Sequence, residues 1–186
     1  MSDIYEVKGE PLKFQLRNER DDFSYYTFRN EKYRYNLTFT IKEVFINPKF
    51  EMQYMGRVKV VNVCEPSFVC HGYYDDNNNF FSFKTNEERI GRIEKEYSSI
   101  FRTFATVHEI FLKYLKKRYD SIDILTLFMV QNDNTSIRHD IYLRLAENIA
   151  NRFNLNIYET EEENIYIYTQ EYEEDYIKKL IEKKLI

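Results

Sequence analysis

Two histidines are the side chains of this sequence best suited to acid–base chemistry, because imidazole changes its charge near neutral pH. His108 and His139 each fall in a segment whose apolar residues recur every three or four positions. Neither has a nucleophile or an orienting carboxylate at a spacing typical of a catalytic site. We therefore expect His108 to be a half-buried packing residue and His139 to lie on a solvated helix face. No residue is predicted to be catalytic.

A metal site is the second chemistry to consider. Cys64 and Cys70 are separated by five residues, and His71 follows directly. A structural zinc site takes four ligands, and the spacing of a CxxC pair is absent. Two cysteines are also fewer than a disulfide framework normally uses. We expect reduced, partly buried thiols, with no metal and no other cofactor.

An acidic segment near the C-terminus is the candidate binding surface. Between Leu155 and Tyr176 the sequence holds eight Asp and Glu residues and no Lys or Arg. Such a segment is typical of a solvated face, and contact with a basic partner is the sharper alternative. Tyrosine suits a surface where one side of the ring packs and the other stays wet. The candidate partner-binding residues are Glu161, Glu162, Glu163, Tyr166, Tyr168, Tyr172, Glu173, Glu174 and Tyr176. The open alternative is that this terminal segment folds back onto its own domain.

Charge and composition exclude several classes of protein. The chain has 186 residues, 43% hydrophobic, and a formal net charge of −4. A general nucleic-acid binder needs clustered Lys and Arg, and a sheet that stacks bases needs aromatic residues between them. In this sequence basic and aromatic residues alternate only over 32–35. No apolar run approaches the length of a membrane span, and the charged N-terminus carries no signal-peptide pattern. We expect neither nucleic acid nor a membrane as a partner.

Period-two patterns predict strands in the first half of the chain. Apolar side chains alternate at Tyr33, Tyr35, Leu37, Phe39 and Ile41, which indicates a strand with one buried face. With the aromatic run 23–28 this segment predicts a hairpin. Further strands are expected over 50–55, 57–63 and 80–83, with Gly56 at a turn or bulge.

The pattern changes to a helical period in the second half. Amphipathic helices are expected near 99–118, 136–153 and 172–184, and Ser98 or Ser99 is a candidate cap for the first. The nearly continuous apolar run 122–130 suits a strand covered on both faces. A closing hairpin is predicted over 155–158 and 165–168, and Asn154 suits the end of the helix before it.

These elements predict an α+β fold: a mainly antiparallel sheet, then helix–strand–helix and a closing hairpin, with a C-terminal helix. The predicted organisation is an N-terminal arm or weak edge strand over 1–20, a single domain over 21–170 and a C-terminal helix over 171–186.

This order of elements is similar to the GNAT acetyltransferase-like fold. More narrowly, residues 23–158 resemble a group of small proteins encoded by tailed bacteriophages. The likeness is carried by FRNEKYRY at 28–35, IFRTFATVHEIF at 100–111 and SIRHDIYLRL at 136–145. It implies a non-enzymatic, virion-associated structural protein that is assembled in the host cytoplasm and acts through protein–protein contacts. The implied partners are other virion proteins or further copies of the chain.

Two alternatives accompany this interpretation. The first is a phage inhibitor of a host defence protein, which would bind a basic host protein through the acidic edge over 159–175. The second is a GNAT-type acyltransferase. That fold holds the acyl-CoA pyrophosphate with closely spaced glycines before its long helix, where this chain has Gly91 alone. Tyr142 is similar in position to the general-acid tyrosine of active members, and we interpret it as a packing residue.

Overall fold

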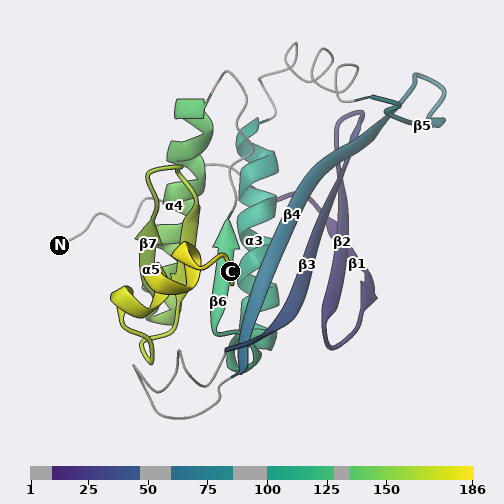
Figure 1. The fold of residues 1–186 in the computed structure, drawn as a ribbon. Coiled ribbons are helices and arrows are strands. Elements are labelled where there is room, and N and C mark those ends of the chain that lie inside the picture. The colour runs from purple at the N-terminus through teal and green to yellow at the C-terminus, as the bar shows by residue number, and fades with distance from the viewer. Residues whose placement is uncertain (1–9, 47–59, 86–99, 128–134) are drawn as a thin grey trace. The chain divides into compact units, whose positions relative to one another are not determined.

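The computed structural model describes residues 10–46, 60–85, 100–127 and 135–186 (Figure 1). Its strands are β1 (Phe14–Glu19), β2 (Phe23–Asn30), β3 (Tyr33–Phe45), β4 (Val60–Tyr74), β5 (Phe80–Ser82), β6 (Ile124–Leu127), β7 (Asn156–Glu159) and β8 (Ile165–Tyr168). Its helices are α3 (Ile100–Arg118), α4 (Thr135–Phe153) and α5 (Glu174–Glu182), and the 3-10 turn η2 (Tyr119–Ser121) follows α3.

The eight strands form one open sheet with the order β1-β2-β3-β4-β6-β8-β7, and β5 pairs with β4 outside this path. The pairs β1–β2, β4–β5, β6–β8 and β7–β8 are antiparallel, whereas β4 and β6 run parallel. The predicted class, an α+β fold with a mainly antiparallel sheet and a C-terminal helix, is therefore confirmed.

The chain separates into two compact units. Among the described residues, unit 1 contains 40–46, 60–66, 118–127 and 135–186, and unit 2 contains 10–39, 67–85 and 100–117. Part of the predicted arm over 1–20 is the edge strand β1, which pairs with β2. The single domain over 21–170 stays a prediction.

Unit 2 is built on the alternation that predicted β3. Tyr33, Tyr35, Leu37 and Phe39 are all buried, while the residues between them are half-buried. From α3, the Tyr114 ring stacks on Phe39 at 3.9 Å between ring centres. The Asn30 side chain also donates a hydrogen bond to the Thr103 hydroxyl at 2.8 Å, within this core. The helix thus covers the aromatic face of the strands.

Unit 1 has helices on both faces of its strands. All four residues of β6, which lies between β4 and β8 in the sheet, are buried. In β8, Tyr166 and Tyr168 join a buried cluster with Ile177 and Leu180 of α5. The buried stripe of α4 comprises Leu145, Ala146, Ile149 and Ala150, none of which belongs to that cluster. α5 therefore covers one face of these strands and α4 the other. Coverage on both faces explains why the sequence of β6 is continuously apolar.

The ends of α4 and β4 agree only in part with the ends predicted from the sequence. α4 ends at the predicted Asn154, whose φ of 53° is the left-handed conformation that asparagine tolerates. β4 runs from Val60 to Tyr74 and is therefore longer than the predicted strand 57–63. The predicted strand 50–55, Gly56 and the candidate caps Ser98 and Ser99 lie outside the described residues.

Candidate functional site

The acidic residues divide into two groups at opposite ends of β8. The first group is in the turn between β7 and β8, where Glu161 and Glu162 are exposed and Glu163 is half-buried. We call residues 160–163 the acidic turn. Its backbone closes through Thr160, whose N–H donates to the Asn164 carbonyl at 3.0 Å, and whose carbonyl accepts from the Glu163 N–H at 2.9 Å. The turn is thus an ordered structure that presents two carboxylates to solvent.

The second group lies at the start of α5. Glu173, Glu174 and Asp175 are exposed, and Glu173 occupies the N-cap position. Carboxylates at a helix N-terminus interact favourably with the helix dipole. Glu174 also forms an ion pair with Lys178 one turn later, at 2.6 Å. These contacts give the second group a structural role in α5, so the acidic turn is the stronger candidate surface.

The four candidate tyrosines are core residues. Tyr166, Tyr168, Tyr172 and Tyr176 are only 2–5% exposed, and the Tyr172 and Tyr176 rings stack at 5.6 Å. They pack with Val61, Val63 and Ile124 of the sheet. Burial raises the pKa of Tyr166, Tyr168 and Tyr172 above the ordinary value. Their rings are therefore not surface contacts here, because α5 folds back over this face of unit 1, the alternative that the sequence left open.

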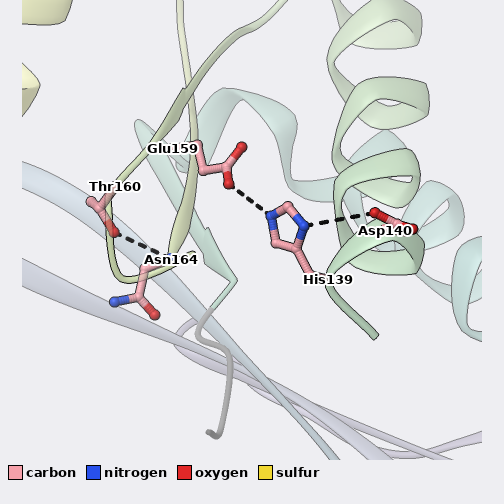
Figure 2. Close-up of polar contacts among 5 residues, drawn as sticks. All are labelled: His139, Asp140, Glu159, Thr160 and Asn164. Atoms are coloured by element: carbon pink, nitrogen blue, oxygen red, sulfur yellow. Dashed lines mark hydrogen bonds and ion pairs between the residues drawn. The ribbon is translucent and has the colours of Figure 1, made fainter. Parts of the chain in front are cut away.

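A histidine–carboxylate pair lies beside the acidic turn (Figure 2). The Nε2 atom of His139 is 2.7 Å from the Oε1 atom of Glu159, and its Nδ1 atom is 3.9 Å from the Oδ1 atom of Asp140. The His139 side chain is 17% exposed and that of Glu159 is 37% exposed. The pair joins the first turns of α4 to the end of β7 and so fixes one side of the acidic turn.

Sequence reasoning missed this pair. We expected His139 on a solvated helix face without an orienting carboxylate, but Glu159 supplies one from 20 residues farther along the chain. No spacing rule identifies it, because the two residues meet only where the chain turns back from α4 into β7. The ring's polar contacts in the described structure are the two carboxylates, with no hydroxyl or thiol to act as a nucleophile. This arrangement can hold a proton and make an ion pair.

The remaining candidate residues do not gather into a reactive site. The Cys64 and Cys70 thiols are not joined in a disulfide, and both are buried, whereas partly buried thiols were expected. His71 is exposed and stacks on Phe80 at 5.6 Å between ring centres. His108 is half-buried on α3, as expected, and Gly91 lies outside the described residues.

In the described part of the chain, no group of three His, Cys, Asp or Glu side chains is arranged to hold a metal ion. None of the described helices is long and apolar enough to cross a membrane.

Comparisons with protein-family models, with curated proteins and with solved structures find no match to this chain.

Proposed function

We propose that this chain is a non-enzymatic protein that acts through protein–protein contacts, and that the acidic turn is its contact surface. The observation that carries the proposal is the exposure of Glu161 and Glu162 on a turn that is held on both sides. Thr160 closes its backbone, and the His139–Glu159 pair links it to α4. A preordered surface loses little conformational entropy on binding, and two exposed carboxylates favour a basic partner.

The proposed setting is the virion of a tailed bacteriophage, with assembly in the host cytoplasm. Support comes from the sequence motifs at 100–111 and 136–145, which belong to α3 and α4. A GNAT-like fold is part of the proposal. Its support is the order in which β2, β3 and β4 are followed by α3, β6, α4 and the β7–β8 pair.

The test is mass spectrometry of purified phage particles. We expect the chain to copurify with particles, and to be released more readily by salt after Glu161→Lys with Glu162→Lys than in the wild type. The matched control is Glu147→Lys with Glu182→Lys, two exposed acids on α4 and α5 of the same unit. Absence of the wild-type chain from particles would refute the virion role.

An inhibitor of a host defence protein is the first alternative, and the acidic turn favours it equally. In that case the chain is absent from particles. It instead binds a basic host protein in a salt-sensitive manner, and the Glu161→Lys, Glu162→Lys variant loses this binding.

An acyltransferase is the second alternative, favoured by the same order of elements as the GNAT-like fold. A thermal-shift titration with acetyl-CoA separates it from the main proposal. Stabilisation that grows with the logarithm of the acetyl-CoA concentration supports the acyltransferase, and an unchanged unfolding temperature supports the non-enzymatic role.

A further inference from the structure

A second charged surface lies in unit 2, where the β4–β5 hairpin meets the turn between β2 and β3. Arg29 is central to it. Its guanidinium carbon lies 4.0 Å from the centre of the Tyr74 ring. Its Nε atom donates to the Glu31 carbonyl and its Nη1 atom donates to the Asn78 side-chain oxygen, both at 2.6 Å. These three contacts hold the guanidinium in one position although the residue is exposed.

Arg34 is held in a similar way. Its guanidinium carbon lies 5.2 Å from the centre of the Phe80 ring, and its Nε atom donates to the Thr27 hydroxyl at 3.3 Å. Phe80 also packs against Tyr74, at 5.2 Å between ring centres. The two arginines therefore lie on a shared aromatic base. We call Arg29, Arg34, Tyr74 and Phe80 the aromatic hairpin surface.

Both positive charges are available to a ligand. In the described part of the chain, the polar contacts of Arg29 and Arg34 are neutral oxygen atoms, and neither side chain contacts a carboxylate. An ordered guanidinium loses little conformational entropy on binding, and its planar donors match the geometry of a carboxylate. The surface is thus prepared to receive carboxylates.

The composition of this surface favours a protein ligand. Arginine and aromatic residues are enriched in protein–protein interfaces and dominate their binding energy. A polyanion such as single-stranded nucleic acid fits less well, because its affinity comes from many Lys and Arg contacts with phosphates, and basic residues alternate with aromatic residues in this chain only over 32–35.

The chain itself carries the complementary carboxylates, in the acidic turn. We propose that the aromatic hairpin surface of one copy binds the acidic turn of a second copy, with Arg29 and Arg34 facing Glu161 and Glu162. This inference rests on the proposed contact role of the acidic turn and names its partner. The contact joins two different surfaces, so repetition generates a closed ring or a filament.

Sedimentation velocity of the purified full-length chain tests the proposal over a concentration series at low and high salt. We expect assemblies larger than a dimer that grow with concentration and dissociate at high salt. Arg29→Gln with Arg34→Gln, and separately Glu161→Gln with Glu162→Gln, should each weaken association at least about tenfold. The matched controls are Arg17→Gln with Arg102→Gln and Glu147→Gln with Glu182→Gln, all exposed residues outside both surfaces.

Mixing the two double variants gives the sharpest result. Each variant keeps one intact half of the contact, so an equimolar mixture should form a 1:1 complex that cannot extend. Arg34→Gln alone leaves the Arg29–Asn78 hydrogen bond in place, and it should still weaken association if the double variant misfolds.

Three outcomes would overturn the inference. They are a wild-type chain that stays monomeric at every concentration, association that survives loss of both arginines, and arginine-dependent binding of a fluorescent oligothymidine by a monomer. If the chain does not self-associate but salt still releases the Glu161→Lys, Glu162→Lys variant from particles more readily than the wild type, the proposed function stands and only self-association is refuted.

Discussion

The carboxylate of Asp123 accepts a hydrogen bond from the phenol of Tyr172 at 3.1 Å. The same carboxylate accepts a second bond from the Asn62 backbone N–H at 2.8 Å. The Asp123 backbone adds two more, since its N–H donates to the Asn62 carbonyl and its carbonyl accepts from the Thr169 N–H. One residue before β6 thus connects β4 to the segment that leads into α5, and helps to hold α5 over the sheet.

This connection predicts a graded loss of stability. Tyr172→Phe removes one hydrogen bond and should lower the free energy of unfolding by about 1 kcal/mol, whereas Asp123→Ala removes two and should cost about 1–3 kcal/mol. Urea denaturation measures both. Tyr119→Phe, a half-buried tyrosine of η2, is the control. An Asp123→Ala variant as stable as the wild type would show that the connection is not stabilising.

Alkaline pH should unfold the protein through its buried tyrosines. Burial raises the pKa of Tyr35, Tyr166, Tyr168 and Tyr172 above the ordinary value of 10.0. The folded state therefore favours neutral phenols, while the unfolded chain ionises near pH 10. The free energy of unfolding should be unaffected by these tyrosines below about pH 10 and should fall as the pH rises above it, because the unfolded state releases its protons first.

Phenolate absorbance and circular dichroism, recorded over one pH titration, check this expectation. A fraction of the phenolate signal should appear together with the loss of folded structure. Tyr168→Phe should reduce the alkaline loss, and Tyr25→Phe in β2 is the comparison. Complete tyrosine ionisation in a chain that remains folded would contradict the prediction.

Gly72 should tolerate no side chain. A Cβ atom at this position would press on the Phe81 carbonyl oxygen and lie 2.7–2.9 Å from two ring carbons of Phe80. Gly72→Ala should displace the β4–β5 hairpin and cost about 1–3 kcal/mol of the free energy of unfolding. Near-UV circular dichroism and denaturation measure the two effects. Ser82→Ala, at the position paired with Gly72, should be close to neutral.

The His139–Glu159 pair should contribute little to stability. Both side chains remain partly exposed, at 17% and 37%, so solvent and salt screen their attraction. A double-mutant cycle with His139→Ala and Glu159→Gln should give a coupling energy below about 1 kcal/mol, and smaller still at high salt. A much larger coupling, insensitive to salt, would indicate a role beyond an exposed ion pair.

Most helices and strands could be predicted because their signals are local. The alternation from Tyr33 to Phe39 is a property of neighbouring residues, and it became β3 with those aromatic residues buried. The helical period near 99–118 became α3, and the apolar stripe near 136–153 became α4. In each case one face of the element is buried away from water, and the spacing of the apolar side chains identifies that face.

β4 was predicted less well. Only its first residues carry a clear strand pattern, yet it continues to Tyr74. Its later part is supported by contacts with other segments, such as the stacking of Phe68 on Phe28 at 6.2 Å and the pairing with β5. Backbone hydrogen bonds to a neighbouring strand can extend a segment whose own sequence is ambiguous.

The candidate surface also has features that the sequence predicts and features that only the tertiary structure determines. That residues 155–176 are acidic and rich in tyrosine follows from the amino acids alone. Which of them meet solvent does not, because a tyrosine is equally suited to a core and to a wet surface. Folding of α5 over β8 buried the tyrosines and left Glu161 and Glu162 exposed. The return of the chain from α4 into β7 brought His139 to Glu159. These outcomes depend on contacts between distant residues, which no local pattern records.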